Sequence, residues 1–255
     1  STAKVSIALA EELTRALLQD VPSVYNTRIN DVLLTALVQS FGGWTGQPSL
    51  LIDLEGHGRE DLFEDVDLSR TVGWFTTLFP VQLTLESLED PGEALKSIKE
   101  QLRRIPKGGI GYGVLRYLHQ DSDIKQQLAA LKPAPVSFNY LGQLERMLST
   151  STGLGVIKEL KSEQSPRSYR SHLLGVSGFV SEGKLEMTFA YSDRIHKKST
   201  IEGLAHGFIQ ALETLITHCQ RPDTGGYTPS DFSASNLNQK QLDKLMSRMN
   251  KRKRR

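Results

Sequence analysis

Residues 49–60 read Ser-Leu-Leu-Ile-Asp-Leu-Glu-Gly-His-Gly-Arg-Glu, an apolar run that passes directly into charges and glycines. The first six residues have the length and composition of a buried β-strand. An ordinary strand does not end in so dense a set of charges and glycines. The strand end therefore holds candidate functional groups, and the first of them is the carboxylate of Glu55.

On either side of this stretch, helical and strand patterns alternate. The spacing of apolar residues predicts helices over residues 10–18, 27–41, 91–104, 114–118, 124–131, 198–219 and 238–249. Strands are predicted over residues 4–8, 49–54 and 136–141, and a hairpin over residues 173–180 and 184–191. Alternation combined with a hairpin predicts an α/β (α+β) sandwich, in which helices cover a mixed β-sheet.

Proline and glycine predict where several elements end. Val21-Pro22-Ser23 is expected to break the first helix, and Gly42-Gly43 to end the second, which Thr27 or Asn30 would cap. Pro80 marks an edge or a break within the apolar residues 72–85. Residues 106–113 are predicted to form a glycine-rich loop, and residues 148–155 a Ser/Thr/Gly loop.

Composition excludes several classes of protein. Of 255 residues, 38% are hydrophobic, which argues against a mostly disordered chain. The single cysteine, Cys219, allows neither an intrachain disulfide nor a multi-cysteine zinc site, and it fits a reducing, cytoplasmic setting. No apolar run reaches the roughly 18 residues of a membrane span, and the first residues lack the order of a signal peptide.

The net charge of +2 comes from the C-terminus. The last five residues are all basic, so the rest of the chain carries a net charge of −3. Nucleic-acid binding would rest on this tail alone, without interleaved aromatic residues, and it is not expected. Neither a Gly-x-Ser-x-Gly elbow nor a His-Glu-x-x-His zinc helix occurs, and Cys219 is expected to be a packed, inert thiol.

Four segments are denser in glycine, aromatic and polar residues than a fold alone requires. They are Glu-Gly-His-Gly-Arg-Glu at 55–60, Thr-Val-Gly-Trp-Phe-Thr at 71–76, Pro-Lys-Gly-Gly-Ile-Gly-Tyr-Gly at 106–113 and Phe-Asn-Tyr-Leu-Gly at 138–142. In this order and spacing they resemble the C-terminal half of the condensation superfamily of nonribosomal peptide synthetases, and within it the epimerization domain. The resemblance covers residues 1–232 and leaves residues 233–255 as a C-terminal helix and basic tail.

The resemblance implies a chloramphenicol-acetyltransferase-like lobe. The family pairs two such lobes around a tunnel, and its N-terminal lobe carries a His-His-x-x-x-Asp-Gly motif. No two of the six histidines here are adjacent, so the chain looks like the second lobe alone. Its partners would be the N-terminal lobe and a peptidyl carrier protein, whose phosphopantetheine arm holds the substrate. No metal or bound cofactor is implied, and neither nucleic acid nor membrane is an expected partner.

The implied activity is that of an amino-acid epimerase (an isomerase), in which a base removes the α-proton of an aminoacyl or peptidyl thioester. By resemblance, Glu55, Asn139 and Tyr140 are the catalytic residues, and a histidine of the absent lobe stands opposite Glu55. Asn139 and Tyr140 would line the same tunnel and orient the thioester or its enolate. A dry tunnel would raise the pKa of Glu55. The alternative for Glu55 is a structural pairing with Arg59 or a distant lysine.

The other motif residues are assigned to tunnel or loop support, namely His57, Arg59, Trp74, Gly111 and Tyr112. His57 could be a second acid–base group, but is expected to hold its loop by hydrogen bonds. Trp74 and Phe75 are most simply core or lobe-interface aromatics. The glycines at 109, 111 and 113 match no phosphate-binding pattern, so residues 106–113 are expected to form a tight turn near the lobe interface.

Two other functions remain open at this point. The chain could belong to an amide-forming condensation domain, or it could be a non-catalytic module that binds a carrier protein or a partner lobe. The last helix and tail resemble a docking segment for a downstream synthetase with an acidic helix, or else form an interdomain linker.

Overall fold

The computed structural model describes residues 2–143, 169–232 and 237–253. The predicted loop at 148–155 lies outside these residues. The chain divides into two compact units. The sheet unit comprises Ser1–Thr14, Leu51–Gln82 and Pro106–His206, and the helix unit comprises Arg15–Leu50, Leu83–Ile105 and Gly207–Arg255.

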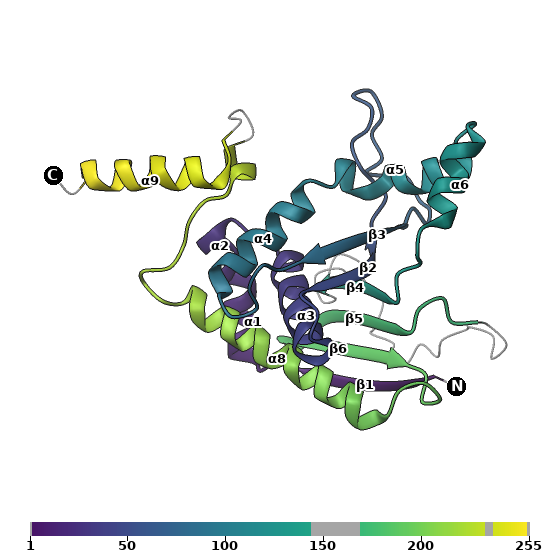
Figure 1. The fold of residues 1–255 in the computed structure, drawn as a ribbon, viewed down its shortest axis with the longest axis horizontal. Coiled ribbons are helices and arrows are strands. Elements are labelled where there is room, and N and C mark those ends of the chain that lie inside the picture. Colours follow the sequence, from purple (N-terminus) through teal and green to yellow (C-terminus); the bar gives the residue numbers. More distant parts are fainter. Residues whose placement is uncertain (1, 144–168, 233–236, 254–255) are drawn as a thin grey trace. The chain divides into compact units, whose positions relative to one another are not determined.

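Six strands form one mixed sheet in the order β1-β6-β5-β4-β2-β3, as Figure 1 shows. They are β1 (Ala3–Ala8), β2 (Ser49–Gly56), β3 (Thr77–Thr84), β4 (Val136–Gln143), β5 (Leu174–Ser181) and β6 (Lys184–Tyr191). The strands β2, β4 and β5 run parallel, whereas β6 is antiparallel to both β5 and β1. The predicted mixed sheet and hairpin are therefore confirmed, and Pro80 lies in an edge strand, β3.

Alternate side chains give the sheet two different faces. The buried positions of β2, β4, β5 and β6 are apolar, including Ile52, Leu54, Val136, Phe138, Leu174, Val176, Met187 and Phe189. The intervening positions carry most of the polar side chains of these strands, and the Ser6 and Thr188 hydroxyls of neighbouring strands lie 3.0 Å apart on that side. The period of two therefore separates a core face from a polar face, and the polar face includes Asp53 and Glu55.

The helices of the described residues are α1 (Glu11–Gln19), α2 (Val21–Tyr25), α3 (Ile29–Thr45), α4 (Pro91–Arg103), α5 (Ile110–Gly113), α6 (Ser122–Ala130), α8 (Lys198–Cys219) and α9 (Gln239–Lys253), together with the short helical segments η1 (Pro106–Gly109), η2 (Val114–Leu118) and η3 (Pro229–Phe232). None of these described helices has the length and hydropathy needed to cross a membrane.

The first helix, α1, ends at Gln19, so the predicted break at Val21-Pro22-Ser23 is confirmed. Val21 nevertheless begins a new helix, α2, because proline is tolerated in the first turn of a helix. Two predictions about the ends of the next predicted helix are wrong. The second helix continues through Gly42-Gly43 and ends at Gly46, which has a left-handed φ of 70°. Its N-cap is Arg28, whose N–H donates to the Asp31 carboxylate at 2.6 Å.

The glycine-rich segment at 106–113 is also not an open loop. It forms η1 followed by α5, with a kink at Lys107 and Gly108, which have φ values of 47° and 59°. A Cβ on the next residue, Gly109, would overlap the Phe79 ring, so this position requires glycine both for space and for its φ of 81°.

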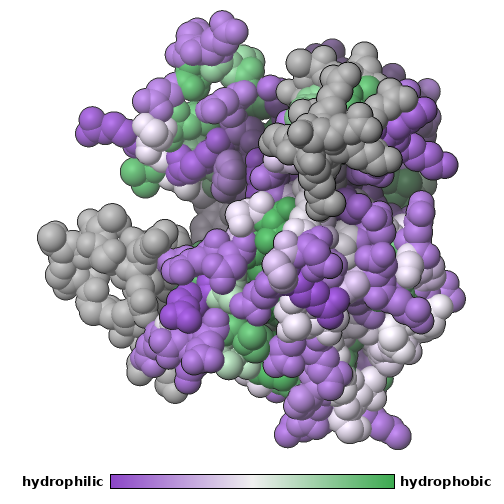
Figure 2. All heavy atoms as spheres, turned by 90° about the vertical axis from the view of Figure 1, so that its left-hand side faces the viewer, coloured by the Kyte–Doolittle hydropathy of each residue, from purple (hydrophilic) through white to green (hydrophobic). Residues whose placement is uncertain are grey.

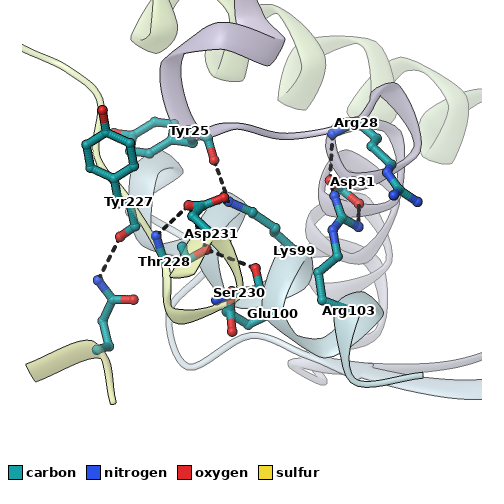
Figure 3. Close-up of polar contacts among 11 residues, drawn as sticks. Tyr25, Arg28, Asp31, Lys99, Glu100, Arg103, Tyr227, Thr228, Ser230 and Asp231 are labelled. Atoms are coloured by element: carbon teal, nitrogen blue, oxygen red, sulfur yellow. Dashed lines mark hydrogen bonds and ion pairs between the residues drawn. The ribbon is translucent and has the colours of Figure 1, made fainter. Parts of the chain in front are cut away.

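The helix unit is held together by buried ion pairs, drawn in Figure 3. Lys99 of α4 is 1% exposed, and its ammonium donates to both Asp231 carboxylate oxygens at 2.7 and 2.8 Å and to the Tyr25 carbonyl at 2.8 Å. Arg103, one turn further along α4, makes a two-point contact with Asp31 of α3 at 3.1 and 2.7 Å. These contacts tie α2, α3 and η3 to α4.

Some apolar side chains remain at the surface. Figure 2 shows hydrophobic residues reaching one face of the molecule in patches between hydrophilic ones. In the sheet unit, the large exposed apolar side chains fall mainly in two segments: Leu62, Phe63, Val66, Val72 and Trp74, and then Val114, Leu115, Tyr117 and Leu118. Exposed apolar groups at this density are typical of surfaces that contact another protein part.

Candidate active site

The site begins where β2 and β4 run side by side. Their parallel register pairs Asp53 with Ser137 and Leu54 with Phe138, which sets Glu55 beside Asn139. The Asn139 amide donates to Oε2 of Glu55 at 2.6 Å. The structure thus brings together two of the three predicted catalytic residues, which are 84 positions apart in the sequence.

Glu55 is exposed, but its surroundings still change its acidity. Partial burial of the carboxyl is the largest effect and raises its pKa. Two smaller effects oppose this change, namely the charge of His172 and the hydrogen bond from Asn139. The carboxyl is therefore reachable, oriented by an amide and a stronger base than a fully solvated glutamate.

Tyr140 follows Asn139 on β4 and is half-buried. Burial raises the pKa of Tyr140, which keeps the phenol protonated and able to donate a hydrogen bond. Within the part of the chain that the structure describes, the hydroxyl makes no hydrogen bond to Glu55 or Asn139, so this third predicted residue is near in sequence but is not joined to the pair.

The loop after β2 is closed by its own charged residues. The Arg59 N–H donates to Nδ1 of His57 at 3.0 Å, and Nε2 of His57 lies 3.4 Å from Oε1 of Glu60. The Arg59 guanidinium donates to the Leu68 carbonyl at 2.9 Å and lies 4.5 Å from the Phe75 ring centre. Arg59 is thus occupied with its loop, and the alternative in which it pairs with Glu55 is wrong.

Glycine makes this closure possible at one position. Gly58 has a φ of 67°, and a Cβ there would overlap the Phe75 carbonyl oxygen. Any larger residue would push the chain near Phe75 away from the strand end.

The remaining motif residues lie around this loop. Trp74 is 90% exposed, so the core interpretation of this residue is wrong for the chain as described. Gly111 and Tyr112 lie on α5 rather than in a tight turn, and open space surrounds the position of a Gly111 Cβ. The preceding η1 approaches β2, because a Cβ on Gly56 would lie 3.5 Å from the Gly108 carbonyl oxygen.

The sequence reasoning missed one pair of residues at the site. Nε2 of His172 lies 2.7 Å from Oδ2 of Asp53, and both side chains are largely enclosed. The available signal was Asp53 itself, because it is a charged residue within an otherwise apolar strand. In the described residues, no group of three or more His, Cys, Asp or Glu side chains is placed to hold a metal ion.

The lone cysteine lies outside this constellation. Cys219 is buried at the end of α8, and burial raises the pKa of its thiol to about 11. A thiol of that pKa is almost entirely protonated at neutral pH, and the prediction of an inert thiol is confirmed.

Comparison with known proteins decides the family. The family model described as the condensation domain matches residues 1–238. The chain belongs to the condensation domain family. The solved epimerization domain from the third module of tyrocidine synthetase B, a structural neighbour, has a TM-score of 0.75 and 39% identity, covering 86% of this chain and 48% of that one. The predicted fold class, a chloramphenicol-acetyltransferase-like lobe, is confirmed.

Curated relatives of this condensation-family chain are peptide synthetases. One linear gramicidin synthase polypeptide of Brevibacillus parabrevis is 46% identical over 244 residues, which are 95% of this chain and 3% of that protein. Chondramide synthase of Chondromyces crocatus is 45% identical over 248 residues, 96% of this chain and 6% of that protein. The chain thus spans a small part of these synthetases and about half of the solved epimerization domain.

Proposed function

We propose that this chain is the C-terminal half of an epimerization domain in a nonribosomal peptide synthetase. The domain would convert the L form of an aminoacyl or peptidyl thioester to the D form at its α-carbon. The observation that carries the proposal is the Glu55 carboxyl, which is held by Asn139 at 2.6 Å, open to solvent and raised in pKa. Such a group is oriented for proton transfer and is not consumed by a structural ion pair.

The chemistry needs one proton to leave and one to return. The Glu55 carboxylate takes the α-proton, and the electron pair of that C–H bond moves onto the thioester oxygen to form an enolate. A proton delivered to the opposite face of the α-carbon then gives the other configuration. We assign this delivery to a histidine of the His-His-x-x-x-Asp-Gly motif on an N-terminal lobe. Asn139 keeps Glu55 oriented, and the Tyr140 phenol is a donor for the enolate oxygen.

The proposal includes partners but no resident cofactor. The substrate would arrive on the phosphopantetheine arm of a peptidyl carrier protein in the cytoplasm. The N-terminal lobe would cover exposed apolar residues such as Trp74 and Val72. Without that lobe, the chain would lack one of the two proton-transfer groups and would be inactive.

Amide-bond formation is the second candidate, since the family is named for condensation. The solved condensation domain of a monacolin K polyketide synthase has a TM-score of 0.63 and 16% identity, a likeness of fold alone. The 39% identity to an epimerization domain favours epimerization over condensation.

The test is α-proton exchange. A carrier protein loaded with an aminoacyl thioester is incubated in D₂O with the two-lobe domain that contains this chain, and deuterium uptake and chirality are followed. We expect exchange and D-product with both lobes present, and neither with this chain alone. Absence of exchange, combined with amide product when an acceptor is supplied, would instead establish condensation. Absence of both reactions would leave a non-catalytic binding module.

We further propose that α9 and the basic tail dock onto an acidic helix of a downstream synthetase. Near the start of α9, Leu242 is buried and Gln239 donates to the Tyr227 carbonyl at 3.1 Å, so this part of the helix packs on the rest of its unit. Deletion of residues 236–255 should abolish transfer to the partner and leave α-proton exchange unchanged. Unchanged transfer would show that the segment is a linker.

A further inference from the structure

The Asp53–His172 pair lies beside the proposed base but has no part in the mechanism above. Nε2 of His172 and Oδ2 of Asp53 are 2.7 Å apart, and the two side chains are 13% and 17% exposed. The other ring nitrogen of His172, Nδ1, lies 2.9 Å from the Ser171 hydroxyl. With both nitrogens engaged, the imidazole has a fixed orientation.

The pair is also close to Glu55 along the strand. Asp53 and Glu55 are two residues apart on β2, so their side chains leave the same face of the sheet. The charge of His172 stabilises the ionised form of Glu55 and acts in the same direction as the Asn139 hydrogen bond. The enclosure of the carboxyl acts in the opposite direction.

We propose that His172, held in place by Asp53, is a positioning residue that keeps Glu55 ionised when the substrate arrives. The inference rests on the proposed function, because it concerns the same proton transfer. A protonated imidazole would balance the charges of two neighbouring carboxylates, Asp53 and Glu55. Without it, the two like charges on one strand would favour protonation of one carboxyl, and less of Glu55 would be ionised at acidic pH.

The charged surroundings of His172 are few among the described residues. From β2, Asp53 contacts its ring and Glu55 interacts with its charge, and β4 contributes the neutral Asn139 next to Glu55. On the segment of His172 itself, Arg170 is engaged elsewhere, because it donates to the Ala190 carbonyl at 2.8 Å and to the Thr2 hydroxyl at 3.3 Å. Among the described residues, His172 is the charged group whose interaction lowers the pKa of Glu55.

The pH dependence of exchange follows from this arrangement. Glu55 must be ionised to remove a proton, so the rate falls as the pH drops through its pKa. Loss of the His172 charge raises the pKa of Glu55 and moves this acidic limb to higher pH. The exchange rate on this limb should fall by about 3- to 10-fold, with little change above it.

The experiment uses the complete two-lobe domain and an aminoacyl carrier protein in D₂O. Exchange is measured from pH 5 to 9 on the enantiomer from which Glu55 removes the proton, with kcat and KM separated at each pH. His172→Gln should move the acidic limb upward through kcat, with KM unchanged. His172→Lys retains a positive charge and should keep the limb near its original position. His206→Gln is the matched control, because His206 lies exposed on α8 and its ring is hydrogen-bonded, within the described part of the chain, to the Glu202 carbonyl of its own helix.

A direct titration of Glu55 tests the same point. The ¹³C resonance of the Glu55 carboxyl should respond to the loss of the His172 charge, titrating at higher pH in His172→Gln than in the wild-type domain. Absence of this response, or a His172→Gln profile that coincides with wild type, would overturn the inference. Equal limb shifts in the Gln and Lys variants would overturn it too, since they would indicate a structural role. Normal α-proton exchange in Glu55→Gln would instead contradict the proposed function itself.

Discussion

Carboxylates occupy opposite settings in the two units of the chain. In the helix unit, Asp31 and Asp231 are each bound by two donors or more, including a cation that contacts both oxygens. In the sheet unit, Glu55 accepts one hydrogen bond from a neutral amide and remains exposed. In the first arrangement, both oxygens of each carboxylate accept hydrogen bonds, whereas in the second, Oε1 of Glu55 accepts none from the described residues.

The difference gives a way to separate structural from functional acids. A buried carboxylate whose oxygens all accept hydrogen bonds contributes mainly to stability, and its loss lowers the free energy of unfolding. A carboxylate that is oriented but still has free hydrogen-bonding capacity contributes mainly to reactivity, and its loss lowers the reaction rate. The following predictions test whether the two units divide in this way.

The largest effect is expected at Glu55. In the two-lobe domain, Glu55→Gln keeps an oxygen that accepts from Asn139 but cannot take a proton, so α-proton exchange should fall by at least about 10³-fold. The measurement is deuterium uptake into the carrier-bound aminoacyl group. Asp53→Asn, two residues earlier on β2, is the comparison, and it should retain far more activity. Near-normal exchange in Glu55→Gln would remove the base assignment.

The next effect is on stability, at Lys99. Lys99→Met leaves Asp231 as an enclosed charge without its cation, and the free energy of unfolding should fall by about 3–5 kcal/mol. Lys96→Met is the matched control on the same helix, since Lys96 pairs with the exposed Glu93 and should cost less than about 1 kcal/mol. Equal losses in the two variants by urea denaturation would contradict the structural role of Asp231.

A smaller change in rate is expected at Asn139. Asn139→Ala removes the amide that holds Oε2 of Glu55, so the carboxylate loses its orientation, and exchange should fall by about 10- to 100-fold. The acidic limb of the pH–rate profile should also move upward, because the hydrogen bond lowers the pKa of Glu55. If exchange is unchanged, the amide is not an orienting group.

The smallest effect is a gain in stability at Glu55. Because its pKa is raised in the folded state, the protonated form is favoured there, and ionisation near neutral pH lowers stability. Glu55→Gln should therefore raise Tm slightly at pH 7. The gain should disappear as the pH falls below the pKa of an unfolded glutamate. A lower Tm of Glu55→Gln at pH 7 would instead show that Glu55 stabilises the fold.

Much of the scaffold was predictable from the sequence, because local patterns control it. The period of two along residues 184–191 and the unbroken apolar repeat of residues 198–219 correspond to β6 and α8 with the same bounds. Glycines predicted helix ends less well. Gly42 and Gly43 remain helical, and α3 ends instead at Gly46, which adopts the left-handed conformation of a helix C-cap.

The candidate site was predictable only in part. Glu55 and Asn139 were found from motifs, and their contact depends on a parallel register that no local pattern reveals. The Asp53–His172 pair joins residues 119 positions apart, and His172 belongs to none of the four motifs. Such pairs depend on how distant strands meet, and they require a structure.

The ion pair between Lys99 and Asp231 also has a consequence for the construction of hybrid synthetases. The segment that carries Asp231 follows the long helix α8 and could be mistaken for a disposable connection. A junction placed before residue 228 would replace Asp231 with a residue of the other synthetase and leave the buried Lys99 ammonium without its carboxylate partner. A junction after residue 232 instead transfers Asp231 together with α4, whose Lys99 it binds. The segment to be exchanged therefore extends past α8 and includes η3.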